Sequence, residues 1–78
     1  MEIISEVISI LSEVAADRIS YGIQPTTTLV ELSLSSLEFV DIVVQVEELF
    51  GMEFEDVMLL PEAFPSVLSF AEYVENRR

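Results

Sequence analysis

The segment from Ser36 to Phe50 constrains the fold most, because its sequence marks both ends of a helix. Ser35 and Glu38 have the S-x-x-E spacing of a capping box, in which each side chain bonds the other residue's backbone N–H. This spacing predicts Ser35 as the N-cap and Ser36 as the first helical residue. Gly51 follows Phe50, and glycine is the residue that most often ends a helix in the left-handed conformation. We therefore expect a helix over residues 36–50.

This predicted helix has two apolar faces with acidic residues between them. The wider face is suited to a core and consists of Phe39, Ile42, Val43, Val46, Leu49 and Phe50. The polar arc consists of Glu38, Asp41, Gln45 and Glu48. A narrower apolar stripe consists of Leu37, Val40 and Val44, with Glu47 beside it. The stripe either widens the core or forms a contact surface for a partner, and the wheel leaves both interpretations open.

Two further helices are predicted at the ends of the chain. Residues 2–19 share an apolar face, with Arg18 near the C-terminal end, where a cation complements the helix dipole, and Tyr21-Gly22 as the stop. That face consists of Ile3, Ile4, Val7, Ile8, Leu11, Val14, Ala15 and Ile19. A last helix follows Pro65, with Ser66 as its N-cap, and runs to about Glu75. Its apolar side consists of Val67, Leu68, Phe70, Ala71 and Val74.

The connections between these helices are irregular. Residues 20–35 form a long loop, because Pro25 and the threonines after it disfavour a helix. Four apolar residues should hold this loop against the core: Ile23, Leu29, Leu32 and Leu34. Residues 52–55 look extended, and residues 56–60 fit one short helical turn ended by Pro61. The pattern predicts an all-α fold, a small bundle of three main helices and one short helix.

Composition narrows the function classes. The chain has 78 residues, no cysteine and no histidine, which excludes disulfides, thiolate metal sites and the commonest general base. Fifteen acidic residues against three arginines give a net charge of −12. Such a surface repels nucleic acids and anionic membranes and attracts basic protein partners. We expect a cytoplasmic protein, because no leader peptide or membrane span is evident, and a monomer, because the charge is high and uniform.

The residues offer no catalytic or metal site. Ser36 has no histidine to activate it, and arginines do not deprotonate. Acidic pairs such as Glu47-Glu48 are typical of a solvated surface, and residues 53–56 lack the ligand pattern of a calcium loop. Gly22 and Gly51 are the only glycines, so no glycine-rich phosphate loop exists. We predict a protein that presents a group rather than an enzyme.

Two motifs resemble the signature of acyl carrier proteins. Leu32–Asp41 reads LSLSSLEFVD, and Val46–Gly51 reads VEELFG. The family pattern is commonly L-G-x-D-S-L, followed one helix later by L-E-x-x-F-G, and the serine-to-Phe-Gly spacing matches without gaps. The likeness extends over most of the chain, from the Pro25–Leu29 stretch before the motif to the final helix. It implies one acyl-carrier-like domain over residues 1–78.

The resemblance also implies a cofactor, a site and partners. In this family, the serine at position 36 receives 4′-phosphopantetheine from coenzyme A through a separate phosphopantetheinyl transferase. The thiol of the arm carries an acyl group as a thioester to acyl-transferring and condensing enzymes, as in fatty-acid or polyketide biosynthesis. Those enzymes carry basic patches, and they dock on the second helix of the carrier. Matched onto this chain, the docking residues are Leu37, Val40, Asp41, Val44, Glu47 and Glu48.

The chain departs from the family pattern at two positions. Ser33 replaces the usual glycine, and Ser35 replaces the usual aspartate before the modified serine. Ser35 can cap the helix in place of the aspartate, but it lacks the negative charge that transferases of the family commonly recognise. Two alternatives therefore stay open. One is a helical interaction module that has the carrier fold without the arm, and the other is a peptidyl or aminoacyl carrier.

Overall fold

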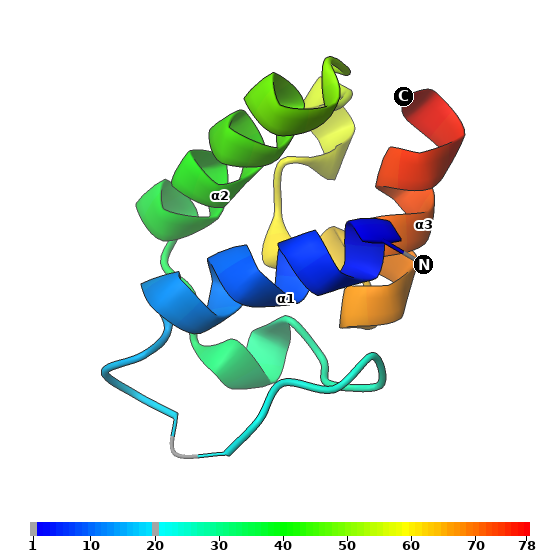
Figure 1. Cartoon of the computed structure of the whole chain (residues 1–78). Helices are drawn as coiled ribbons and strands as arrows, with labels where there is room; N and C mark the ends of the chain where they lie inside the picture. Colours follow the sequence, from blue (N-terminus) through cyan, green and yellow to red (C-terminus); the bar gives the residue numbers. More distant parts are fainter. Residues whose placement is uncertain (1, 20) are drawn as a thin grey trace.

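Three α-helices surround one hydrophobic core in the computed structural model, which describes residues 2–19 and 21–78. They are α1 (Glu2–Val14), α2 (Ser36–Phe50) and α3 (Val67–Arg77). α1 packs against both of the others and crosses beneath α2 (Figure 1). No strand occurs in these described residues, so the predicted all-α bundle is confirmed.

Each of the two helices that follow a loop begins at a predicted cap. Ser35 caps α2 and Ser66 caps α3, and both form capping boxes, with Glu38 and Ser69 respectively. Gly51 ends α2 in the left-handed conformation with φ of 63°, and its N–H donates to the Glu47 carbonyl at 2.9 Å. Local sequence therefore fixes where α2 and α3 begin.

The first predicted helix is too long. α1 ends at Val14, and the chain continues in tight turns, with the Arg18 N–H donating to the Ala15 carbonyl at 3.1 Å. Arg18 thus lies outside the helix and does not complement its dipole, because the last turn of α1 contains no basic residue. Tyr21-Gly22 is consequently not the helix stop.

The long α1–α2 connection is packed down as predicted, although Ser20, the first residue of the predicted loop, lies outside the described residues. Ile23, Leu29 and Leu32 are buried, and Leu34 is half-buried against the core. A 3₁₀ turn, η1 (Val30–Leu32), lies within it and was not predicted. The Pro25 and Thr27 carbonyls accept the N–H groups of Leu68 and Val67, at 2.9 and 2.8 Å. The loop therefore supplies hydrogen-bond acceptors for the N–H groups in the first turn of α3.

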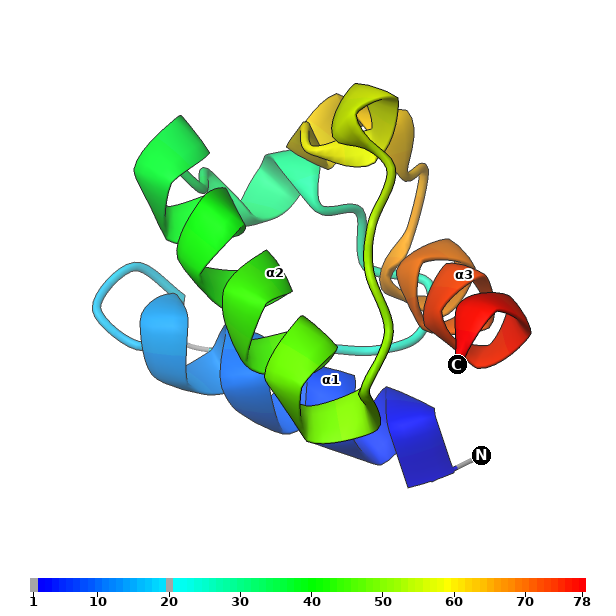
Figure 2. The ribbon, with the colours of Figure 1, turned by 90° about the horizontal axis from the view of Figure 1, so that it is seen from above.

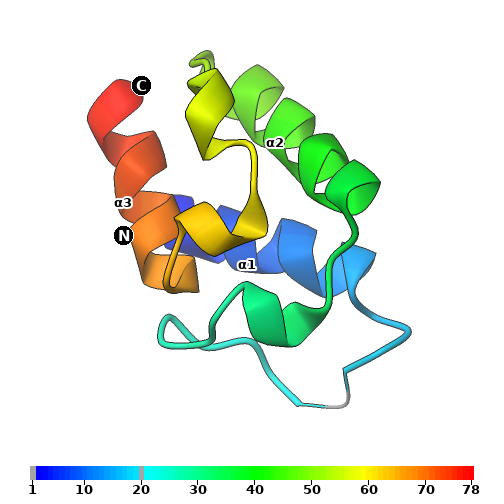
Figure 3. The same cartoon turned by 180° about the vertical axis from the view of Figure 1, so that it is seen from behind.

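The connection between α2 and α3 contains two 3₁₀ turns, η2 (Asp56–Met58) and η3 (Pro61–Ala63), which lie between the two helices (Figures 2 and 3). The predicted short turn at residues 56–60 is thus three residues long, and Pro61 starts a second turn after it, since its fixed φ suits a first helical position. Residues 52–55 contain no helix, and α3 continues two residues beyond Glu75.

Aromatic rings fill the space between α2 and α3. Neighbouring ring centroids lie 5.0–6.3 Å apart, within the range of favourable aromatic contacts. The cluster consists of Phe39, Phe54, Phe64, Phe70 and Tyr73. Phe39 belongs to α2, so this cluster fixes how α2 turns its opposite side to solvent.

Candidate functional site

The candidate site is the serine turn at the start of α2. Ser36 is the first residue of the helix and is exposed. The residues around it form the predicted capping box: the Glu38 N–H donates to Ser35 Oγ at 3.1 Å, and the Ser35 N–H donates to Glu38 Oε1 at 2.9 Å. Ser36 lies inside this bonded turn, so its backbone is held while its hydroxyl faces solvent.

The approach to this turn includes a strained residue. Ser33 has φ of 55° and ψ of 41°, the left-handed conformation that L-residues other than asparagine and aspartate rarely adopt. Its N–H donates to the Val30 carbonyl at 3.1 Å and closes η1. The neighbouring Leu32 is fully buried. The left-handed residue therefore turns the chain from the buried loop to the exposed serine turn.

An arginine from beyond the end of α1 holds the serine turn from outside. Arg18 Nη1 donates to Glu38 Oε1 at 2.9 Å, and Arg18 Nη2 donates to Glu38 Oε2 at 2.7 Å. The hydrogen bonds from Arg18, with that from the Ser35 backbone, lower the pKa of Glu38 to about 2, and the same pairing raises the pKa of Arg18. Sequence reasoning missed this contact, because the two residues are 20 positions apart.

This arrangement suits attachment rather than catalysis. The N–H groups of Ser36 and Leu37 have no acceptor among the described residues, and free N–H groups at a helix start favour a phosphate. No group of three or more metal-ligating side chains occurs in the part of the chain that the structure describes. The exposed Ser36 hydroxyl is thus placed to carry a phosphate-linked group, and the chain has no histidine or lysine that could act as a base for it.

Five of the six predicted docking residues are exposed along α2. Leu37, Val40 and Val44 are 83%, 41% and 43% exposed, so the stripe does not widen the core. Asp41 and Glu48 are exposed and form no ion pair within residues 2–19 and 21–78. Glu47 differs, because it is half-buried and its Oε2 accepts the Phe54 N–H at 2.8 Å. α2 carries no basic residue, so this face is apolar and negatively charged.

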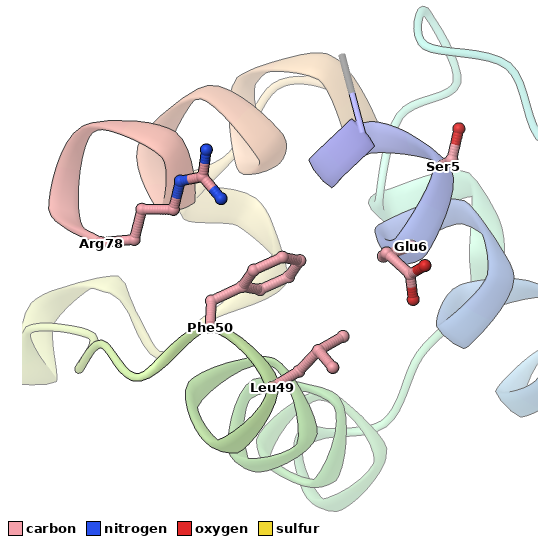
Figure 4. Close-up of a pocket in the computed structure, with 5 residues that line it drawn as sticks. All are labelled: Ser5, Glu6, Leu49, Phe50 and Arg78. Atoms are coloured by element: carbon pink, nitrogen blue, oxygen red, sulfur yellow. The ribbon is translucent and has the colours of Figure 1, made fainter.

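One predicted core residue of α2 is misplaced. Leu49 is 52% exposed, where the wheel had assigned it to the core. It lies at the edge of an open surface pocket of about 470 Å³ near the start of α1 (Figure 4). The other lining residues are Ser5, Glu6, Phe50 and Arg78. Leu49 also lines a second shallow pocket with Ile10, Gln45 and Glu48, so a groove rather than a packed contact separates α1 from this end of α2.

Comparison with known proteins gives the family. A family model described as "Phosphopantetheine attachment site" matches residues 2–74. The chain is also 46% identical, over 99% of its length, to the "Acyl carrier protein, mitochondrial" of Dictyostelium discoideum. The chain belongs to the acyl carrier protein family. Its members carry 4′-phosphopantetheine covalently, and the exposed hydroxyl at the start of α2 fits that group.

The extent of these matches differs. The chain spans 59% of the length of the Dictyostelium carrier. No solved structure matches the chain significantly. In the described residues, no helix is both long and apolar enough to cross a membrane. The family assignment therefore depends on the sequence matches, and the bundle described above agrees with it.

Proposed function

We propose that Ser36 carries the 4′-phosphopantetheine arm and that the chain delivers acyl groups, as thioesters on that arm, to partner enzymes of fatty-acid or polyketide-type biosynthesis. The carrying observation is the position of Ser36, an exposed hydroxyl at the first residue of α2 inside the region that the family model matches. The thiol of the arm supplies the thioester chemistry for which a chain without cysteine has no group of its own.

The chain's own part in loading is to hold and present the hydroxyl. The Ser36 oxygen must form a bond to the phosphorus of the pantetheine phosphate while the phosphoanhydride bond of coenzyme A breaks; adenosine 3′,5′-bisphosphate leaves, and the serine proton passes to a base. Because the chain has no histidine or lysine, and Glu38, the acid closest to Ser36 in the sequence, is held by Arg18 with a lowered pKa, the proton acceptor belongs to the transferase. This division agrees with a carrier that has no enzymatic activity.

The partner surface of this proposal is the exposed face of α2. Leu37, Val40 and Val44 supply apolar contacts, and Asp41, Glu47 and Glu48 supply the charge that attracts basic patches. Exposed charges act mainly through screened, long-range attraction, which speeds encounter more than it lengthens residence. Such contacts suit a carrier that must leave each partner. The proposed partners are the phosphopantetheinyl transferase and the acyl-transferring and condensing enzymes.

The test of the site is intact-mass analysis after incubation with coenzyme A and a broad-specificity transferase. We expect the wild-type protein to gain one phosphopantetheine mass, the Ser36→Ala protein to gain none, and the Ser33→Ala protein to gain one as a matched hydroxyl control. Circular dichroism should show that Ser36→Ala keeps its helices, because the side chain is exposed. A loaded Ser36→Ala protein would show that the site is wrong.

A wild-type protein that no transferase loads favours the interaction module without an arm, for which Ser35 in place of aspartate is the motivating feature. Mass analysis of protein from its own cells then reports both the arm and its cargo, and a peptidyl or aminoacyl cargo would replace the acyl proposal. The relative is mitochondrial by name, whereas the sequence alone predicts the cytoplasm. Imaging of the tagged natural protein decides between these compartments.

A further inference from the structure

Arg18 and Glu38 form the connection that this inference concerns. Arg18 lies after the end of α1, and Glu38 lies in the first turn of α2; these two chain segments lie side by side (Figures 1 and 2). The guanidinium binds the carboxylate through both of its terminal nitrogens, at 2.9 and 2.7 Å. Such a two-point contact fixes orientation as well as distance, because the fork of an arginine matches a carboxylate only in one plane.

Glu38 belongs to two bonded groups at once. Its Oε1 accepts both the Ser35 N–H and Arg18 Nη1, and its own N–H donates to Ser35 Oγ. Ser36 therefore lies between Ser35 and Glu38, which are hydrogen-bonded to each other. Glu38 is also bonded to Arg18, which lies beyond the end of α1. Without Arg18 the capping box would still form, but its only anchor would be α2 itself.

Basic residues are rare in this chain, and one of them lies beside the serine turn. The chain has three basic residues, and the other two, Arg77 and Arg78, are at its C-terminal end. Arg18 is consequently the one basic side chain in residues 1–76 of a chain with a net charge of −12. Its side chain and that of Glu38 are 27% and 30% exposed, so the pair is partly shielded from solvent. Asp17 contributes a longer contact to the same guanidinium, at 3.4 Å.

We propose that Arg18 is a positioning residue for the loading of Ser36: through Glu38, it sets the orientation of the first turn of α2 and so of the serine hydroxyl. This inference rests on the proposed function. It predicts an effect on the reaction step, because phosphoryl transfer depends on the alignment of the attacking oxygen. It predicts little effect on docking, because Leu37 and Val44 lie on the exposed face and take no part in the two hydrogen bonds of the pair.

The test compares Arg18→Met with Arg77→Met in transferase-catalysed loading. Arg77 is a matched control, since it also forms a cross-element ion pair, with Glu55 at 3.1 Å, and its loss changes the net charge equally. We expect Arg18→Met to lower kcat about tenfold with KM within about twofold, and Arg77→Met to change neither. Rates are measured well below the melting temperature of each variant.

Three further variants separate positioning from other roles. Arg18→Lys keeps the charge and should recover part of kcat. Glu38→Gln keeps an oxygen for the Ser35 N–H but loses the ion pair, so it should lower kcat as Arg18→Met does. The double variant, which combines Arg18→Met with Glu38→Gln, should be no slower than either single variant, because both substitutions remove the same contact. The Phe39 N–H donates to the Ser35 carbonyl at 2.9 Å. Its amide exchange should be faster in Arg18→Met, in Glu38→Gln and in the double variant, which all lose the ion pair.

Each outcome decides the matter. Equal kcat for Arg18→Met and Arg77→Met, with wild-type protein loaded normally, would overturn the positioning role and leave Ser36 as the site. An effect of Arg18→Met without an effect of Glu38→Gln would show that Arg18 contacts the transferase directly, which also overturns it. A rise in KM alone would identify a docking residue instead. Failure of the wild-type protein to load would refute the proposed function itself.

Discussion

Replacing Ser33 by glycine should stabilise the protein, because Ser33 has the left-handed backbone with φ of 55°. The side chain is exposed and donates no hydrogen bond to any residue that the structure describes, so its removal costs no contact. Glycine adopts this conformation without the clash between Cβ and the following carbonyl oxygen. The residue usual at this position of the family is also glycine.

The size of the effect follows from two opposing terms. A left-handed L-residue costs about 1–2 kcal/mol, which glycine avoids. Glycine in turn has more freedom in the unfolded chain, which offsets about 0.5–1 kcal/mol. The net gain in the free energy of unfolding is therefore about 0.5–1 kcal/mol. For a domain of this size, about 4–8 °C of melting temperature corresponds to each kcal/mol, so we expect a rise of about 2–8 °C.

Thermal and urea melts followed by circular dichroism measure this difference. Ser9→Gly is the matched control, since Ser9 is exposed in the middle of α1, where glycine should lower stability by about 0.5 kcal/mol. Ser33→Ala should stay close to wild type, because alanine keeps the strain. If Ser33→Gly melts at or below the wild-type temperature while Ser9→Gly behaves as expected, the left-handed assignment is refuted.

Three other predictions use the same melts or a binding assay. Adding ~0.1 M salt, which shortens the screening length to about 10 Å, should raise the melting temperature, because it weakens self-repulsion at a net charge of −12; no response would count against that reasoning. Glu38, with its pKa lowered from 4.5 to about 2, should stabilise the fold fully above pH 4.5 and lose that contribution between pH 4.5 and 2. The stability difference between wild type and Glu38→Gln should shrink over that range, and a difference that grows on acidification would contradict the ion pair. Leu37→Ser should change stability by less than about 0.5 kcal/mol and still weaken binding to the transferase, as measured by titration calorimetry; unchanged affinity would remove Leu37 from the docking face.

The parts of the fold that sequence predicted well are those set by neighbouring residues. Ser35, Glu38 and Gly51 fix the bounds of α2, and Ser66 fixes the start of α3, because caps act over three or four positions. The buried anchors of the long loop were also predicted, although Val30 in the same loop is 63% exposed. The signature around Ser36 then indicated the family.

The parts that sequence did not predict depend on contacts between distant segments. The apolar pattern continues past Val14 to Ile19, but the chain leaves the helix there and Arg18 reaches Glu38. Leu49 has the spacing of a core residue, yet α1 leaves a groove at that end of α2. No local pattern contains the angle between two helices. The exposure of the Val44 side of α2 was left open for the same reason.

The carbonyls of Pro25 and Thr27 bear on the timing of synthesis. Both accept N–H groups from the start of α3, so the loop that leads to Ser36 has its partners only after Val67 and Leu68 have been made. A nascent chain that still lacks those residues should present a loose serine turn. We expect a transferase to act poorly on such a fragment.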